Sequence, residues 1–163
     1  MASNNTLIVF KPYDNEPPVS NYATLDLRNN HPVLDFDDST NETAIFTGLM
    51  PRIYNSGGIT VYIHFSMTSA ITGLVDWDIS FEGIGSEGQD LDSDGFAAIV
   101  SVNSNAVSAT TGNVVIVNLS FTSGAQMDNI NVGDTFRLKI TRDAVSDTAV
   151  GDAELVAIEI KET

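Results

Sequence analysis

Apolar and polar residues alternate along much of this 163-residue chain, and the alternation is clearest at residues 59–67. Apolar side chains such as Val61 and Ile63 occupy every second position there, while Tyr62 and His64 occupy positions between them. A period of two places successive side chains on opposite faces of an extended strand. The pattern predicts a half-buried strand with Tyr62 and His64 on its outer face.

The same alternation predicts strands at residues 76–82, with Trp77 pointing inward, and at residues 136–142. Short runs rich in β-branched and aromatic residues between turn signals predict further strands. The whole predicted set covers residues 7–10, 23–28, 33–37, 43–47, 59–67, 76–82, 96–102, 114–122, 136–142 and 154–161. Apolar residues do not recur at helical spacing over more than about one turn, so we expect little helix.

Turn-forming residues separate the predicted strands at short intervals. Residues 29–32, with the sequence NNHP, predict a hairpin turn between the strands at 23–28 and 33–37. About ten short strands separated by turns favour an all-β fold, an antiparallel jelly-roll sandwich of about 8–10 strands. A seven-stranded immunoglobulin-like sandwich fits less well, because it usually shows a Cys, Trp, Cys pattern and this chain has no cysteine.

The length fits a single domain, and the composition is that of a folded globule, with 42% apolar and 18% charged residues. Residues 11–22 are the most loop-like part of the chain. We therefore expect residues 1–22 to form an N-terminal arm with the first strand, and residues 23–163 to form one jelly-roll domain. The arm is a candidate for contact with a neighbouring molecule.

Charge and cysteine content exclude several classes of function. The chain carries 22 Asp and Glu residues against seven Lys and Arg, a formal net charge of −15. Such a surface repels phosphate backbones and anionic lipids, so we expect neither nucleic acid nor membrane as a partner. The lack of cysteine excludes disulfides, thiolate metal sites and cysteine nucleophiles. The N-terminal residues lack the pattern of a secretory signal, which predicts synthesis in the cytoplasm.

One acidic loop is a candidate metal site. Asp90, Asp92 and Asp94 alternate in the sequence DLDSDG, as at the start of an EF-hand. An EF-hand needs a bidentate carboxylate at its twelfth position, which here is Ser101, so that motif is excluded. A calcium ion held in an irregular loop by these three carboxylates, together with Glu87, is one interpretation, and a solvated acidic turn is the other. We expect no other cofactor.

No pattern in the sequence is typical of an active site. His31 and His64 are the two histidines, and the chain has no Gly-x-Ser-x-Gly nucleophile motif. Paired acids such as Asp76 and Asp78 share a strand face, a spacing too common to indicate a glycosidase. The glycine-rich segments lack the Lys and the following helix of a phosphate-binding loop. We therefore expect a noncatalytic protein.

Aromatic and apolar side chains on outer strand faces are candidates for binding. Tyr54 is a candidate for a sugar-binding platform, because aromatic rings stack on the apolar faces of sugars. Tyr62 and His64 share an outer strand face, where amphipathic rings also favour subunit contacts. The strand that begins at Val114 has apolar residues on both faces, so Val114 and Ile116 are candidates for a contact between copies.

Three stretches resemble a family of small structural proteins of tailed bacteriophages: residues 22–67, GDTFRLKITRDA at 133–144 and GDAELVAIEIKET at 151–163. The resemblance implies a virion protein, either a capsid decoration or fibre protein or a tail adhesin, assembled in the host cytoplasm. It also implies a homotrimer that binds phage capsid or tail proteins. The strand pattern resembles that of tumour necrosis factor-like trimers in architecture alone. Strand and turn residues carry the resemblance, so it implies no catalytic residue.

Three hypotheses follow, in order of preference. The first is a noncatalytic, homotrimeric structural protein on the exterior of a phage particle. The second is a carbohydrate- or receptor-binding module in which Tyr54, Asp90, Asp92 and Asp94 bind a host surface glycan around a calcium ion. The third is an enzyme that acts on glycans.

Overall fold

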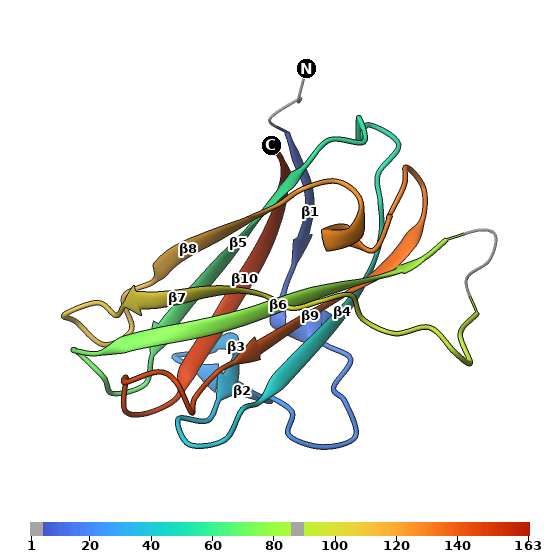
Figure 1. Cartoon of the computed structure of the whole chain (residues 1–163). Coiled ribbons are helices and arrows are strands. Elements are labelled where there is room, and N and C mark those ends of the chain that lie inside the picture. Colours follow the sequence, from blue (N-terminus) through green and yellow to red (C-terminus); the bar gives the residue numbers. More distant parts are fainter. Residues whose placement is uncertain (1–4, 86–89) are drawn as a thin grey trace.

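The computed structural model describes residues 5–85 and 90–163, and Figure 1 shows two β-sheets packed face to face. The ten strands in these ranges are β1 (Thr6–Phe10), β2 (Thr24–Arg28), β3 (His31–Phe36), β4 (Thr43–Leu49), β5 (Ile59–Met67), β6 (Leu74–Ile84), β7 (Val100–Ala106), β8 (Val115–Phe121), β9 (Thr135–Arg142) and β10 (Ala153–Glu162). Within the same ranges the helical elements are two 3-10 turns, η1 (Pro12–Asp14) and η2 (Ala125–Met127). The predicted all-β sandwich of about 8–10 strands is confirmed.

The strands in both sheets pair in antiparallel fashion, and their order brings distant parts of the chain together. The larger sheet, here called sheet A, has the order β2-β3-β10-β5-β8, and β1 also pairs with β10. The smaller sheet, sheet B, has the order β4-β9-β6-β7. Strand β10 is therefore central in sheet A. Strand β5 pairs with one edge of β10. On the other edge of β10, β3 pairs with the first half and β1 pairs with the second half.

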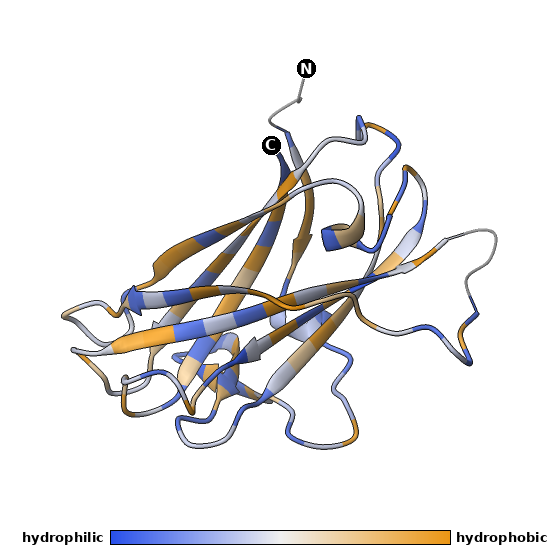
Figure 2. Cartoon of the chain, viewed as in Figure 1, coloured by the Kyte–Doolittle hydropathy of each residue, from blue (hydrophilic) through white to orange (hydrophobic). Residues whose placement is uncertain are grey.

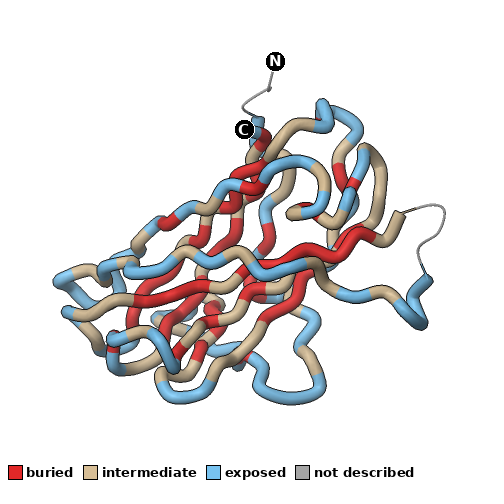
Figure 3. Tube along the Cα trace, in the orientation of Figure 1, coloured by how far each residue is buried: buried red, intermediate tan, exposed pale blue. Residues whose placement is uncertain are grey.

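The inward faces of the two sheets form the hydrophobic core (Figures 2 and 3). Buried residues alternate along β9, whereas β5, β6 and β10 are buried over most of their length, on both faces. Val61, Ile63 and Phe65 are fully buried, as their spacing predicts. Trp77 of β6 is also fully buried, and its ring makes edge-to-face contacts with Phe36 and Phe65, at 5.1 and 5.5 Å between centroids. These ring contacts join sheet B to sheet A.

A buried arginine braces one end of the sandwich. Arg142, at the end of β9, is fully buried and ion-paired with Asp147, with Nε and Oδ2 2.7 Å apart. Its guanidinium also donates to the backbone oxygens of Phe36, Ala149 and Gly151 at 2.7–3.0 Å. One side chain therefore connects the end of β3 with the segment between β9 and β10, and it satisfies the carbonyl group of Phe36 and two carbonyl groups of that segment.

The hairpin between β2 and β3 is tighter than the sequence pattern predicts. Asn29 and Asn30 both have positive φ, 46° and 66°, as two-residue turns that match the twist of paired strands require. Because these two residues complete the turn, His31 and Pro32 already belong to β3. Arg28 then pairs directly with His31, so both side chains lie on one face of the hairpin.

Strand β7 begins at Val100, later than the predicted residue 96. The segment before it contains Phe96, whose ring centroid lies 5.0 Å from Arg137 Cζ and 4.5 Å from Lys139 Nζ. Attraction between a cation and an aromatic face holds this segment against the outer face of sheet B. The β-like composition of residues 96–99 therefore reflects this packing, and the regular ladder starts only afterwards.

Residues 11–22 pack on the chain's own sandwich. The backbone N–H of Glu16 donates to Ile45 O at 2.7 Å, and Tyr22 forms a bridge with Thr43. The segment thus covers part of the free edge of β4, which limits unwanted strand pairing there. Contact between this arm and a neighbouring molecule stays a prediction. In the described part of the chain, no helix is long and apolar enough to cross a membrane.

Candidate functional site: a cleft on the outer face of sheet A

Four of the predicted contact residues share the outer face of sheet A. Tyr62 and His64 lie on this face of β5, and both are partly exposed. Val114 directly precedes β8 and Ile116 lies within it, with 50% and 55% of their surfaces exposed. His64 pairs with Ile116 in the register of the two strands. Strand alternation therefore locates this face from the sequence.

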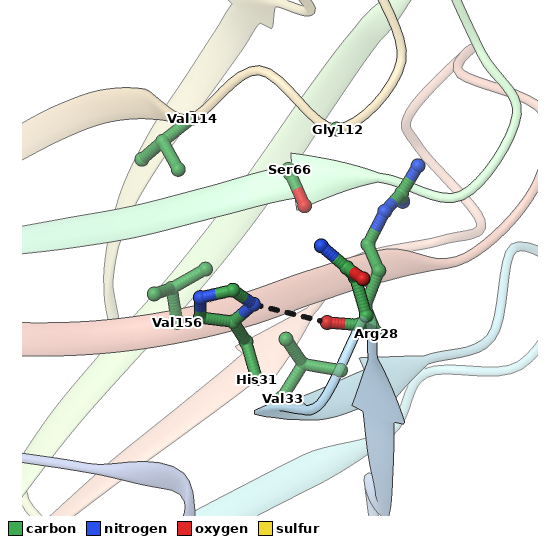
Figure 4. A pocket seen from close by; sticks show the side chains of 8 residues that line it. Arg28, His31, Val33, Ser66, Gly112, Val114 and Val156 are labelled. Carbon is green, nitrogen blue, oxygen red and sulfur yellow. Dashed lines mark hydrogen bonds between the residues drawn. The ribbon is translucent and has the colours of Figure 1, made fainter.

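A cleft of about 330 Å³ opens on the same face (Figure 4). Its lining comes from the β2–β3 hairpin, from β10 and β5, and from the segment before β8. The lining residues are Arg28, Asn29, His31, Val33, Ser66, Gly112, Val114 and Val156. Of the predicted contact residues, Val114 lines the cleft, and Tyr62, His64 and Ile116 lie on the same sheet face outside it.

A β-bulge in β10 supplies part of the cleft floor. Strand β10 pairs regularly with β5 except between Leu155 and Ala157, where Val156 is an extra residue. A bulge changes the direction in which the side chain at the irregular position points. Val156 lines the cleft together with Val33 and Val114, so the floor is apolar.

Arg28 is the one Lys or Arg side chain among the described residues that line the cleft, and its charge is paired within the protein. Arg28 Nη1 donates to the carboxylate of Glu154, whose side chain is only 5% exposed, and to Met67 O at 2.8 Å. Ser66 Oγ donates to the same Glu154 oxygen at 2.9 Å. A Cβ on Gly112 would lie 3.1 Å from Arg28 Nη2, so the guanidinium packs closely on this glycine.

Further acidic side chains surround this ion pair. Asp35 pairs with Glu154 across β3 and β10. Burial, together with the negative charges of Glu154, Asp26 and Asp152, raises the pKa of Asp35 from 3.8 to about 6. Asp35 Oδ1 is buried and has no hydrogen-bond partner within the described ranges. The cleft therefore borders a region of negative electrostatic potential.

Two polar side chains of the cleft, Arg28 and Ser66, are held by hydrogen bonds to Glu154. His31 Nδ1 lies 3.3 Å from the backbone oxygen of Arg28. An apolar floor with a few oriented polar groups at its rim is the usual form of a small-molecule binding site. The arrangement suits recognition.

Tyr54 does not lie on this face. Its side chain is 3% exposed, and its hydroxyl donates to Gly57 O. The prediction that its ring forms an exposed sugar-binding platform is therefore wrong. The physical reason is that the nearby turn provides a carbonyl acceptor, so the ring can be buried with its polar end satisfied. Tyr54 lies in a loop, where no alternation indicates which side chains are buried.

The acidic loop lies apart from the cleft, on the connection between β6 and β7 of sheet B. The N–H of Asp92 donates to Asp90 Oδ1 at 3.0 Å, and that of Asp94 to Asp90 O at 2.8 Å, which makes a compact turn. Among the residues that the structure describes, no three His, Asp or Glu side chains are arranged to hold a metal ion. Glu87 lies outside the described residues. The calcium site stays a prediction, now without Tyr54.

No protein-family model and no curated protein matches this chain. Solved structures do match it over nearly its whole length. A family 35 carbohydrate-binding module from an environmental isolate matches with a TM-score of 0.57 and 15% identity, over 94% of this chain and 92% of that one. The CBM35 from Cellvibrio japonicus Abf62 matches with a TM-score of 0.58 and 6% identity, over 95% and 92%.

A third similar structure is the carbohydrate-binding module CBM6cm-2 from Cellvibrio mixtus lichenase 5A, in complex with cellotriose. It matches with a TM-score of 0.51 and 8% identity, over 98% of this chain and 99% of that one. At such low identity the likeness concerns the fold alone. The chain therefore has the two-sheet, antiparallel jelly-roll architecture of these modules.

Proposed function

We propose that this protein is a noncatalytic carbohydrate-binding module that takes a glycan into the cleft on the outer face of sheet A. The observation that carries the proposal is the cleft itself, with its apolar floor and polar rim. The likeness in fold to modules named for carbohydrate binding supports it. This is the second of the hypotheses drawn from the sequence, with the site moved from Tyr54 and the acidic loop to the cleft.

A sugar ring has both kinds of surface that the cleft accommodates. Its C–H groups form apolar faces that pack on Val114 and Val156. Its hydroxyls need hydrogen-bond partners, which the side chains of Asn29 and His31 provide at the rim. The cleft volume of about 330 Å³ lies at the lower end of the range for ligand sites, which suits a short stretch of glycan.

Val114→Glu is expected to weaken glycan binding at least ~tenfold, because it places a charge on the apolar floor of the cleft. Val114 is half exposed, so stability is expected to change little. Binding is screened on a glycan array and then measured by isothermal titration calorimetry with the glycan that binds best.

The matched control is Val145→Glu, which adds the same charge at a valine that is 78% exposed on the connection between β9 and β10. This variant is expected to bind like the wild type. Equal affinities of Val114→Glu and the wild type would refute the cleft as the site. An array on which no glycan binds would refute the function.

The second candidate is the virion role implied by the resemblance to phage proteins, and we propose it as a structural role that involves self-association. An exposed apolar region supports this candidate. Val9, Tyr13 and Leu49 keep 48%, 66% and 60% of their surfaces exposed around a groove of about 710 Å³ between β1 and β4. Apolar groups beside a free strand edge favour association. The homotrimer, the phage partners and the virion location stay predictions.

The mass in solution tests self-association. At micromolar concentration a homotrimer would show three times the chain mass of 17.4 kDa by light scattering. Val9→Lys is expected to reduce the mass to one chain, because burying an unpaired ammonium group in the contact is unfavourable. Val145→Lys, the control, is expected to behave like the wild type. A wild type that remains a single chain would rule out the trimer.

A further inference from the structure

We propose that Glu154 sets the charge selectivity of the cleft, so that the cleft takes neutral saccharides and rejects acidic ones. This inference rests on the proposed glycan-binding function and narrows it to one class of ligand. Three features of the cleft support it: the ion pair of Arg28, the surrounding acids and the orientation of the guanidinium.

The first feature is that the charge of Arg28 is already neutralised. An arginine in a binding cleft ordinarily attracts a carboxylate, because guanidinium and carboxylate form charge-assisted hydrogen bonds. Here Arg28 makes such a pair with Glu154, which is almost fully buried. Ser66 and Met67 O hold the pair in place. A ligand carboxylate would therefore have to displace a buried partner.

The second feature is the excess of negative charge around the pair. The negative charges of Asp26, Asp152 and Glu154 all act on Asp35, which pairs with Glu154, the partner of Arg28, across β3 and β10. An added ligand carboxylate beside Arg28 would therefore approach an excess of negative charge. Repulsion between like charges is stronger where burial excludes water. A neutral hydroxyl group meets no such repulsion.

The third feature is that Arg28 can still donate to an uncharged ligand. A guanidinium carries five N–H donors, and the bonds to Glu154 and Met67 both leave from Nη1. Nη2 and Nε lie beside Gly112 at the wall of the cleft, where an added Cβ would come within 3.1–3.3 Å of them. Because Arg28 lines the cleft, we expect these N–H groups to be within reach of a ligand hydroxyl.

The test uses three neutral hexasaccharides, β-1,4-linked glucose, β-1,4-linked mannose and α-1,4-linked galactose, each with its counterpart oxidised to a carboxylate at C6. By calorimetry, the wild type is expected to bind a neutral sugar at least ~tenfold more tightly than its acidic counterpart. Glu154→Gln keeps the size of the side chain and its hydrogen bonds but frees the charge of Arg28. The neutral-to-acidic preference is expected to fall at least ~tenfold in this variant.

Glu159→Gln is the matched control, because it removes the same charge from the same strand. Glu159 accepts a hydrogen bond from Thr6 and makes no ion pair with Arg28 among the described residues. The neutral-to-acidic preference of the Glu159→Gln variant is expected to stay within ~twofold of that of the wild type. Asp26→Asn, at an exposed position, lowers the surrounding charge without breaking the ion pair. It is therefore expected to reduce the preference even if Glu154→Gln does not fold.

An unchanged preference in Glu154→Gln would overturn the inference, as would an unchanged preference in Asp26→Asn where Glu154→Gln does not fold. A wild type that prefers the acidic sugars would overturn the inference alone and leave the glycan-binding function standing. If none of the six sugars binds, the inference is overturned, and the glycan array decides separately whether the glycan-binding function stands.

Discussion

Arg142→Ala is expected to lower the free energy of unfolding by about 3–5 kcal/mol. Arg142 is fully buried, and the side chain of its partner Asp147 is 2% exposed. Removing the guanidinium leaves this carboxylate buried without a counter-ion. It also leaves three backbone oxygens without their donor. Both changes are costly, and β3 loses its connection to the segment between β9 and β10.

Urea denaturation followed by circular dichroism measures this loss. The control is Arg52→Ala, at an exposed arginine, which is expected to change stability by less than ~0.5 kcal/mol. The double variant Arg142→Ala, Asp147→Ala is expected to recover part of the loss, because no unpaired charge remains buried. A loss of less than ~1 kcal/mol in Arg142→Ala would contradict the bracing role.

Trp77→Ala is also expected to lower the free energy of unfolding by about 3–5 kcal/mol. Trp77 is fully buried between the sheets and packs edge-to-face on Phe36 and Phe65. Truncation removes the apolar contact and leaves a cavity that the two sheets cannot close without moving. The melting temperature and enthalpy, measured by differential scanning calorimetry, report the change.

Trp77→Phe separates the contribution of packing from that of the indole N–H. Trp77 Nε1 is buried without a hydrogen-bond partner among the described residues, so phenylalanine removes an unfavourable group as well as some volume. We expect this variant to lose less than half as much stability as Trp77→Ala. Equal losses in the two variants would show that the aromatic contacts contribute little.

The fold was predictable because its main signal is local. Along β5 and β6, alternation identifies the apolar side chains of the core, including Phe65 and Trp77, but not the burial of polar residues such as Ser80 and Glu82 on the other face. Successive side chains of a strand point to opposite faces of the sheet, so the inner face of a strand can be identified without knowing which strands pair with it. The boundaries at Val100 and His31 were missed because they depend on a cation–aromatic contact and on a two-residue turn.

The candidate site was predictable only in part. Tyr62, His64 and Val114 were identified as surface candidates, since the outer face follows from the same alternation. Arg28 and Glu154 were not, because they lie 126 residues apart and meet only through the order of strands in sheet A. Nor does any local signal place the β-bulge at Val156, which depends on the register between two strands.

The central position of β10 has a consequence for how the molecule is made. Strand β1 pairs with the second half of β10, and β3 and β5 also pair with β10. During translation, strands from the first third of the chain must therefore wait, partly unpaired, until residues 153–162 leave the ribosome. Pairings between segments so distant in sequence close slowly and leave apolar edges exposed meanwhile. We therefore expect sheet A to be completed only after the last strand of the chain has been made.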